Sequence, residues 1–416
     1  MANQAYALPA GADSESFRSW FMNKLRMGMS WQDYGRSLVT PFNIVAALVL
    51  MVGLPVIVSR FMYGLGTVTH ASNDYPWGLF LGWGLFGGVP LSATGFVMAT
   101  AYYIFGFRRY APMVRIGILT GFLGYLFAVL YLLIDLGRPW RIYFPMTISF
   151  GTASVLFLVA WHVALYLTVQ LLEFSPAIFE WLNSERTRGW AKKITIGMTI
   201  AGIMLSTLHQ SALGAMFLLM PGRVHPLWWS PYLPQLFLAS SVYVAMAMVI
   251  VVSTLAARFL RERCDEVFLG RLDELTIGLA KACSIAMYVY LVMKIISVVH
   301  DAEWALLATP YGYWFLVEVL GFVLLPALVL TAGFKASRVG VVRFGAVLAV
   351  IGVLVNRLNV STLALNYNLP DHLHHIIPPR GELIIVATLT VLHILIFRWI
   401  VNRMAVTRAD PGFKEH

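Results

Sequence analysis

An apolar stretch from Ser206 to Ser230 holds a histidine–glutamine pair, His209 and Gln210, near one end and an aromatic loop, HPLWW, just beyond it. Inside a bilayer these two polar side chains are costly unless they face partner helices, water or a ligand. The HPLWW loop has the composition of a membrane interface, where Trp and His keep a polar edge wet and bury an apolar body. The stretch indicates a ligand site near one membrane face, although such a pair also serves simply to tie helices together.

A carboxylate ends another apolar run, at Asp135 in YLLIDLGRPWR. Tyr131 lies four residues earlier and therefore on the same helix face, and Arg138 follows closely as a candidate ion partner. One interpretation is a salt bridge that fixes the helix end. The other is a carboxyl group that exchanges protons with a ligand near the membrane surface.

His162 lies in the middle of a further apolar run, beside Trp161. A lone histidine at this depth often hydrogen-bonds a neighbouring helix. Together with His209 it would also suit axial ligation of haem, which is a cytochrome b alternative. Against haem, the sequence shows no repeated pair of histidines on two facing helices, the arrangement that stacked haems require.

Four more ionisable residues are scattered over four different apolar runs. Dispersed charges at membrane depth pair across a bundle or line a water-filled path, and a proton route is the more specific hypothesis. The residues are Lys294, Glu318, Arg357 and His393. A further group, the HLHH histidines at 372, 374 and 375, lies in a loop without cysteine or regular ligand spacing, so we predict no metal site.

The composition is that of a polytopic membrane protein. Of 416 residues, 59% are hydrophobic and only 12% are charged, against about a quarter in soluble domains. The two cysteines, Cys264 and Cys283, form no C-x-x-C element, so the chain alone ligates no iron–sulfur cluster or structural zinc, and such a cofactor must sit in a partner. The net charge of +10 is spread over alternate loops rather than one patch, which argues against nucleic-acid binding.

Ten apolar runs are long enough for the roughly 20 residues that a spanning helix needs. We expect an all-α fold of two four-helix bundles, at 77–220 and 234–363, with a first helix at 42–65 and a last helix at 382–404 on their flanks. The expected spans are 42–65, 77–106, 113–135, 147–173, 194–220, 234–260, 273–298, 313–334, 341–363 and 382–404. We expect no cleaved signal peptide in residues 1–41, and FRSWFMNKLRMGMSW within them has the composition of an interfacial helix, with a disordered tail as the alternative.

The basic residues orient these spans. Lys and Arg concentrate in the N-terminal segment, in the tail at 405–416 and in alternate loops, whereas the opposite loops hold only Arg60, Arg138, Arg141, Arg223 and Arg380. Because cytoplasmic loops keep the positive excess, both termini are predicted to be cytoplasmic. The loops poor in basic residues are the aromatic, chemically unusual ones, so we expect the working face and the partner surface outside the cytoplasm.

Several of these motifs together resemble a known family. TLHQSALG followed by RVHPLWWSPYLPQLF, with NDYPWG, IDLGRPWR and WFLVEVLGFVLLP, is similar to the NrfD/polysulfide reductase membrane-subunit family. The likeness covers about residues 42 to 404 and is greatest to the long, ten-helix members, such as the membrane subunits of hydrogenase-2-type enzymes and of quinone reductase complexes. The combination of H-Q-S with H-P-L-W is its most specific part.

This resemblance implies a subunit of the bacterial cytoplasmic membrane that carries no haem or iron–sulfur cluster and binds a quinone, usually menaquinone, in the first bundle near the periplasmic face. It also implies electrons from a periplasmic iron–sulfur subunit, fed by a multihaem cytochrome c, a molybdopterin-type or a hydrogenase subunit. Menaquinone reduction coupled to proton translocation is the expected reaction.

Site residues are carried over from the family by position. His209 and Asp135 are the expected proton donors to the quinone, since an imidazole and a carboxyl group can both donate and be recharged. The quinone head group is expected among Gln210, Arg138, Asn73, Asp74 and Trp77, together with Tyr131 from the helix face of Asp135. The proton path is not carried over from the family; it is expected from the polar residues within the spans, at His162, Lys294, Glu318, Arg357 and His393. Long and short members differ at the start of the second span, where NDYPWG lies.

Two other classes of function also fit a chain of this kind. A secondary transporter uses helix bundles with charges at the membrane midplane, but such folds carry broken helices at matching positions of two halves, and no matched pair is evident. A passive anchor would only tether a redox partner and would bind no quinone.

Overall fold

The structure is a computed structural model that describes residues 14–370, 372–373 and 377–409. Over these residues it is all-helical, with a single isolated bridge between Val224 and Leu365 in place of any sheet. Ten helices are long and apolar enough to cross a membrane, as the sequence predicts. In chain order they are Pro41–Tyr63, Phe80–Ile104, Arg108–Asp135, Val155–Trp181, Glu185–Leu218, Leu233–Phe259, Glu266–His300, Pro310–Lys335, Val339–Leu363 and Arg380–Arg403.

Six of the spans are built on one continuous α-helix each. These are α3 (Pro41–Tyr63), α8 (Val155–Trp181), α9 (Glu185–Leu218), α10 (Leu233–Phe259), α11 (Glu266–His300) and α15 (Arg380–Arg403). The third span is α6 (Ala111–Asp135), preceded by the short turn η4 (Arg108–Tyr110). The remaining connections contain η1 (Leu65–Thr67), η5 (Pro139–Arg141), α7 (Phe144–Thr147), η6 (Arg261–Arg263) and η7 (Glu303–Ala308).

Three spans contain wide π-helical turns, which in proteins often occur at functional sites. The second span runs through η2 (Phe80–Gly87), α4 (Gly88–Leu91), α5 (Thr94–Ala99) and η3 (Thr100–Ile104). The eighth comprises α12 (Pro310–Leu316), η8 (Val317–Leu324) and α13 (Leu325–Lys335), and the ninth comprises α14 (Val339–Leu358) and η9 (Asn359–Leu363). Apolarity alone gives no sign of these turns.

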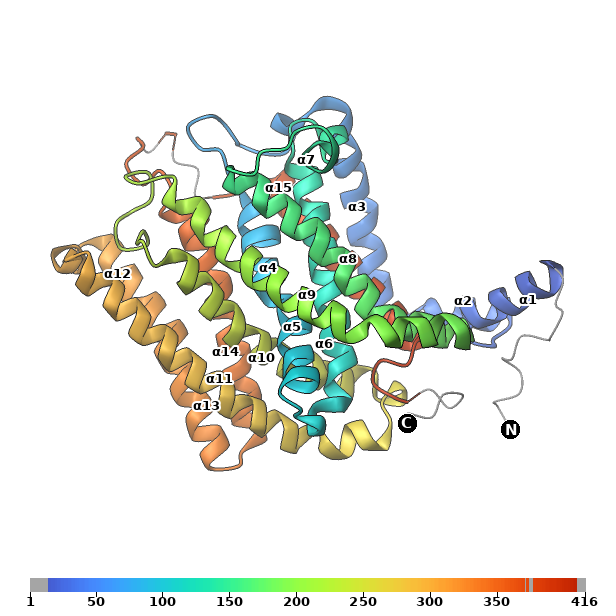
Figure 1. The fold of residues 1–416 in the computed structure, drawn as a ribbon. Coiled ribbons are helices and arrows are strands. Elements are labelled where there is room, and N and C mark those ends of the chain that lie inside the picture. Colours follow the sequence, from blue (N-terminus) through green and yellow to red (C-terminus); the bar gives the residue numbers. More distant parts are fainter. Residues whose placement is uncertain (1–13, 371, 374–376, 410–416) are drawn as a thin grey trace.

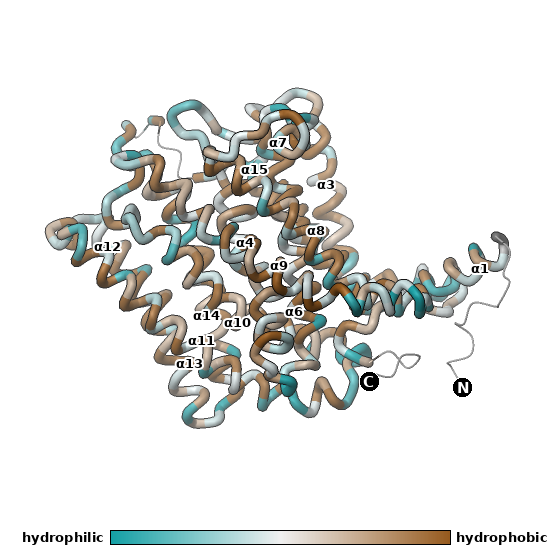
Figure 2. Tube along the Cα trace, in the orientation of Figure 1, coloured by the Kyte–Doolittle hydropathy of each residue, from teal (hydrophilic) through white to brown (hydrophobic). Residues whose placement is uncertain are grey.

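The two ends of the molecule differ in chemistry. We call the end that holds α1 (Ser14–Leu25), α2 (Trp31–Leu38) and the connections at 105–110, 182–184, 260–265 and 336–338 the basic face. The opposite end, with connections 64–79, 136–154, 219–232 and 301–309, we call the aromatic face. Figure 1 shows the two described chain ends on the basic-face side, with α1 and α2 extending sideways from the bundle, and Figure 2 shows the apolar spans between the two ends.

Helices α8 and α9 extend beyond their apolar runs at the basic face. The sequence predicts spans at 147–173 and 194–220, whereas α8 is Val155–Trp181 and α9 begins at Glu185. The extra turns are held by Glu180, whose carboxylate accepts hydrogen bonds from Arg115 at 2.7 and 2.9 Å and from Arg188 at 2.8 Å. Hydropathy marks the part of a helix that suits lipid, and ion pairs outside that part can prolong the helix.

Helix packing brings chain-distant spans together. Helix α6 contacts η2, α5 and α8, and α8 packs along α9, while α10, α11, α13 and α14 contact one another. The first helix, α3, lies against the last, α15, at the side of α6. The division into two four-helix bundles stays a prediction. Close approach of η2 to α6 depends on Gly84, where an added Cβ would lie 2.1 Å from the Tyr131 ring.

Candidate functional site

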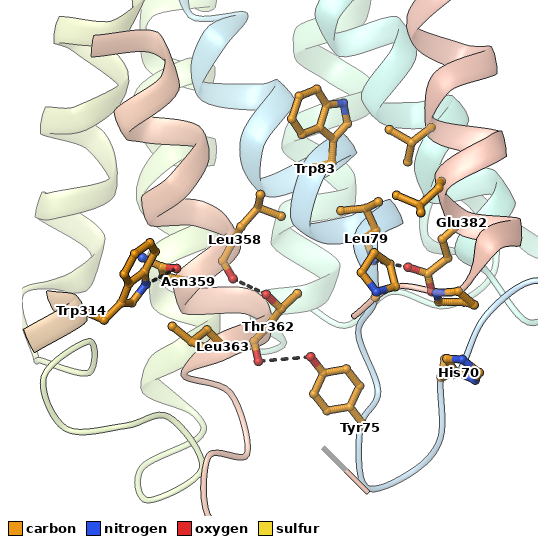
Figure 3. Close-up of a pocket in the computed structure, with 16 residues that line it drawn as sticks. His70, Tyr75, Leu79, Trp83, Trp314, Leu358, Asn359, Thr362, Leu363 and Glu382 are labelled. Atoms are coloured by element: carbon orange, nitrogen blue, oxygen red, sulfur yellow. Dashed lines mark hydrogen bonds between the residues drawn. The ribbon is translucent and has the colours of Figure 1, made fainter. Parts of the chain in front are cut away.

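A cavity of about 550 Å³ opens between η2, η9 and α15 near the aromatic face, and we call it the aromatic-face cavity. Its volume lies within the roughly 300–1,000 Å³ of ordinary ligand pockets. In Figure 3, Glu382 and His70 lie toward one side of it and the Trp314–Asn359 pair toward the other. Its lining is mostly apolar, with polar groups from His70, Tyr75, Trp83, Trp314, Asn359, Thr362 and Glu382.

Glu382, in the first turn of α15, is the acidic group of this cavity. Only 2% of the residue is exposed, and its carboxylate accepts a hydrogen bond from the backbone N–H of Leu79 at 2.6 Å. Gly78 makes this contact possible, because an added Cβ there would lie 2.3 Å from a Glu382 oxygen. A buried carboxylate beside an apolar space is a candidate proton donor or acceptor for whatever fills that space.

Tyr75 is the second group of the cavity that can carry a proton. It lies in the connection before η2, is 3% exposed, and donates from its hydroxyl to the carbonyl of Thr362 at 3.2 Å. Burial, with the negative charge of Glu382 nearby, raises the pKa of the Tyr75 phenol well above its ordinary value. The hydroxyl therefore stays protonated at neutral pH and remains a donor.

The opposite wall of the cavity connects it to a buried charge in the second half of the chain. Trp314 donates to the side-chain oxygen of Asn359 at 3.0 Å, and Asn359 donates in turn to Glu318 at 2.5 Å. Glu318 also accepts from Asn356 at 2.6 Å and from the indole of Trp228 at 2.8 Å. Its carboxylate thus has three donors.

Arg357 balances this carboxylate through an intermediate amide. It donates to the side-chain oxygen of Asn356 at 2.6 Å and to Ser240 at 2.6 Å, and its guanidinium lies 3.6 Å from the centre of the Phe237 ring. Lys294 is buried nearby, with its ammonium 5.1 Å from the centre of the Phe315 ring. We call this group the Glu318 cluster; its members are Trp228, Ser240, Lys294, Glu318, Asn356, Arg357 and Asn359. The structure therefore brings Lys294, Glu318 and Arg357 together.

His209 and Gln210 lie elsewhere, in the interior between α8, α9 and α6. Both are completely buried. Gln210 donates to the carbonyl of Val89 at 3.1 Å and to the hydroxyl of Tyr125 at 3.4 Å, and the His209 ring lies 5.6 Å from the Tyr125 ring. His162 of α8 is close enough to His209 to interact with it electrostatically. None of these side chains lines the aromatic-face cavity.

Asp135 ends α6 at the aromatic face, apart from His209. Ten residues of helix separate it from Tyr125, which is about 15 Å at 1.5 Å per residue. The cation that acts on Asp135 is the buried Arg60 of α3, which also donates to the carbonyl of Ile134 at 2.6 Å. Arg138, the ion partner that the sequence suggested, is exposed. Asp135 also lies near enough to Glu382 for the two charges to interact. The structure brings Asp135 toward the cavity and leaves His209 deep in the protein.

The NDYPWG motif reaches the cavity through Tyr75 and Gly78. Asn73 and Asp74 are exposed in the preceding loop, where the Asp74 carbonyl accepts a hydrogen bond from Asn366. Trp77 packs instead against the rings of Phe86 and Phe217, at 5.4 and 5.5 Å between centroids.

The HPLWW loop folds into the protein. Trp228 is 1% exposed and Trp229 donates to the carbonyl of Phe217 at 3.1 Å. His225 stacks on Tyr311 with 4.6 Å between ring centroids, and burial lowers the pKa of His225 to about 4. The aromatic residues of this loop therefore hold the loop on the helix ends and on the Glu318 cluster. From the sequence we expected these residues at an interface with lipid.

A second, apolar cavity of about 660 Å³ runs from the basic face toward the middle of the protein, between α3, α6, α10 and α15. Tyr131 and His393 line it; Tyr131 donates to the carbonyl of Val386 at 3.2 Å, and His393 stacks on Phe127 with 4.5 Å between centroids. Trp83 lines both cavities. Among the described residues no group of three His, Cys, Asp or Glu could hold a metal ion; His374 and His375 lie outside them.

Sequence reasoning missed four cavity residues, His70, Tyr75, Asn359 and Glu382. Two signals were available. The loop HASNDYPWG is unusually rich in groups that could do chemistry, and Glu382 is a carboxylate at the first turn of an apolar run. Such a carboxylate resembles an ordinary helix end until its burial is known.

Ten apolar spans define a multi-pass membrane protein, and the cavity with its buried carboxylate has a lining that is mostly apolar. The chain belongs to the NrfD polysulphide reductase family, whose model matches residues 67–365. Members of this family are quinone-interacting membrane subunits of oxidoreductase complexes.

Three relatives show how similar this chain is to other proteins in sequence. A protein of Nitratidesulfovibrio vulgaris is 42% identical over 93% of this chain and 100% of its own length. The probable Ni/Fe-hydrogenase 2 b-type cytochrome subunit of Escherichia coli is 29% identical, over 80% of this chain and 84% of its own. The menaquinone reductase integral membrane subunit of N. vulgaris is 25% identical, over 73% of this chain and 75% of its own.

Proposed function

We propose that this chain is the quinone-binding membrane subunit of a respiratory oxidoreductase and that it binds the head group of menaquinone in the aromatic-face cavity. The observation that carries this proposal is an apolar cavity with a buried carboxylate, Glu382, on one side and a buried tyrosine, Tyr75, between its walls. A quinone needs an apolar site for its ring and tail together with proton donors near its two carbonyl oxygens. The name of the menaquinone reductase relative supports the quinone type.

The residues in and around the cavity would have different roles. Glu382 and the Tyr75 hydroxyl supply protons to the head group, and His70 at the same side of the cavity orients it. Asp135, whose charge interacts with that of Glu382, exchanges protons with Glu382. Asn359, held by Trp314 and Glu318, fixes the far wall. His209 and Gln210, which we expected at the head group, belong to the deeper group of polar residues between α8 and α9.

The orientation follows from charge. Because the basic face carries the loops rich in Lys and Arg, the positive-inside rule assigns it and both termini to the cytoplasm of a bacterial inner membrane. The aromatic face then meets the periplasm, where an iron–sulfur subunit would dock and deliver two electrons. A multihaem cytochrome c, a molybdopterin-type or a hydrogenase subunit would feed that partner.

The test uses the purified complex with its partner subunits, supplied with electrons through a reduced viologen dye. Glu382→Gln should lower reduction of a short-chain naphthoquinone by about 100-fold or more, since a positioned acid or base contributes about 10²–10⁴ in rate. Tyr75→Phe should lower it by a smaller factor. Glu274→Gln, an exposed carboxylate on α11 at the basic face, is the matched control and should leave the rate unchanged. Undiminished turnover of Glu382→Gln contradicts the site.

Binding separates this function from a passive anchor. Trp83 and Trp314 line the cavity, so a bound naphthoquinone should quench their fluorescence in the isolated subunit, and Trp314→Phe should remove part of that quenching. An anchor would show no saturable quenching.

One observation favours a second candidate, haem ligation. His162 and His209 lie on facing helices with ring nitrogens that have no protein partner, and the E. coli relative is named a b-type cytochrome subunit. A visible spectrum of the separated subunit decides this: an absorption band of low-spin haem that disappears in His209→Ala would establish it.

A further inference from the structure

Helices α8 and α9 face each other with polar side chains at helical spacing. On α8, His162, Tyr166, Gln170 and Glu173 follow one another at intervals of four, four and three residues, which places them on one face. On α9, Thr199, Ser206, His209 and Gln210 share a face in the same way. We call these eight residues, with Tyr125 of α6, the polar seam. From Glu173 to His162 it covers about 16 Å of helix, or roughly half of the hydrocarbon thickness.

The members of the seam are linked to one another only in part. Thr199 donates to one oxygen of Glu173 at 3.0 Å, and Gln170 donates to the Tyr166 hydroxyl at 3.0 Å. The Tyr166 and Tyr125 rings lie 4.6 Å apart, and Gln210 donates to Tyr125. These contacts leave other polar atoms of the seam without a hydrogen bond to the protein.

Seven buried side-chain atoms of the seam have no protein hydrogen-bond partner. They are Nδ1 of His162, Oε1 of Gln170, Oε2 of Glu173, Oγ of Ser206, Nδ1 and Nε2 of His209, and Oε1 of Gln210. Gln170, Glu173, His209 and Gln210 are themselves at least nine-tenths buried. Because buried polar atoms in proteins are almost always satisfied by protein or by internal water, a line of such atoms indicates water.

The seam also points toward solvent at one end. Seven residues beyond Glu173, on the same face of α8, Glu180 holds Arg115 and Arg188 at the basic face. The Arg115 side chain is 25% exposed and that of Glu180 is 1% exposed, so this ion-pair group bridges solvent and the buried part of the helix. A proton that enters the protein at this point would first meet the carboxylate of Glu180.

We propose that the polar seam is a hydrated proton inlet, in which internal water links the basic face to His209 through Glu173, Gln170, Tyr166 and Tyr125. Glu173 is its proton-accepting group at the basic-face end, and the two tyrosine hydroxyls and the His209 ring continue the line. The ligand of this site is water with a mobile proton. The inlet would recharge protons consumed in quinone reduction, so this role rests on the function proposed above, whereas the hydration does not.

The activity test uses the complete complex in liposomes with an internal pH dye and a viologen donor outside, so that only complexes with an outward aromatic face turn over. Glu173→Gln and Gln170→Leu should each lower proton uptake from the lumen by about 10-fold or more, and naphthoquinone binding should persist. Glu274→Gln again serves as the matched control. Lumenal uptake that is unchanged in both seam variants overturns the inlet.

The second test does not need activity. An experimental map of the wild-type protein that resolves ordered water should show water within hydrogen-bond distance of the free Glu173 oxygen, of Oε1 of Gln170 and of the His209 ring. A seam without water there overturns the proposal even if quinone is reduced. If the wild-type complex reduces no quinone, the function proposed above fails, and this map still decides the hydration of the seam.

Discussion

Two groups of buried polar residues lie in the two halves of the chain, and their hydrogen bonds are satisfied to different degrees. In the Glu318 cluster the carboxylate accepts three hydrogen bonds, Arg357 reaches it through Asn356, and Nε of Arg357 is the one buried side-chain atom without a protein partner. In the polar seam seven side-chain atoms lack a protein partner. Two membrane-embedded polar groups of similar size are therefore arranged for different purposes.

The difference indicates what each group can do. A carboxylate that accepts hydrogen bonds from three neighbouring side chains is held rigidly, since moving it would break several bonds at once. Through Asn359 this rigidity extends to the wall of the aromatic-face cavity. The open atoms of the seam suit exchangeable water. We therefore assign positioning of the cavity wall to the Glu318 cluster and proton supply to the seam; proton conduction through Lys294, Glu318 and Arg357 is the competing outcome.

The largest expected effect follows removal of the Glu318 carboxylate. Glu318→Ala leaves the three buried donors of this carboxylate without an acceptor, and each unsatisfied buried group costs about 1–3 kcal/mol. We expect a marked loss of assembled protein and a lower unfolding temperature in detergent. Glu173→Gln should unfold close to the wild-type temperature, because Thr199 can still donate to the amide oxygen. Equal destabilisation by the two substitutions would show that the Glu318 cluster is no more rigidly held than the polar seam.

Amide-to-leucine substitutions test the same contrast with a smaller effect. Asn356→Leu removes a bond to Glu318 and a bond from Arg357, and hydrogen bonds to charged groups contribute about 1.5–3 kcal/mol each. Gln170→Leu removes one neutral bond to Tyr166 and should change the free energy of unfolding by about 1 kcal/mol. Chemical denaturation of the two variants side by side measures both. A larger loss from Gln170→Leu would show that the seam is the rigid group.

Proton uptake separates the two roles. In the liposome assay, Glu318→Gln should lower quinone reduction and lumenal uptake in the same proportion, because a displaced cavity wall slows the reaction as a whole. Glu173→Gln should lower lumenal uptake more than quinone binding. If Glu318→Gln abolishes uptake while naphthoquinone affinity is unchanged, the proton path lies in the Glu318 cluster, as the sequence suggested.

The sequence predicted the ten spans because apolar runs of sufficient length have few alternatives in a bilayer. It also identified Lys294, Glu318 and Arg357 as ionisable residues that are costly to bury in a membrane. Their proximity in the fold depends on contacts between three helices, which no local sequence pattern records. The cavity was harder to predict. Asn359 comes from a π-helical turn and Glu382 from the first turn of a helix, whereas Tyr75 comes from a loop hundreds of residues earlier in the chain. His209 was expected at the ligand, but its complete burial against Tyr125, away from the cavity, cannot be read from residue spacing.

The smallest expected effect concerns the loop that carries Trp228 to Glu318. Burial lowers the pKa of His225 from 6.5 to about 4, so between these values the unfolded chain binds more protons than the folded one. Stability from this group is therefore complete above pH 6.5 and is lost as the pH falls toward 4. Unfolding temperatures measured from pH 7.5 to 4 should decline less steeply in His225→Gln than in the wild type. An identical decline in both would show that protonation of His225 has no part in holding this loop on the Glu318 cluster.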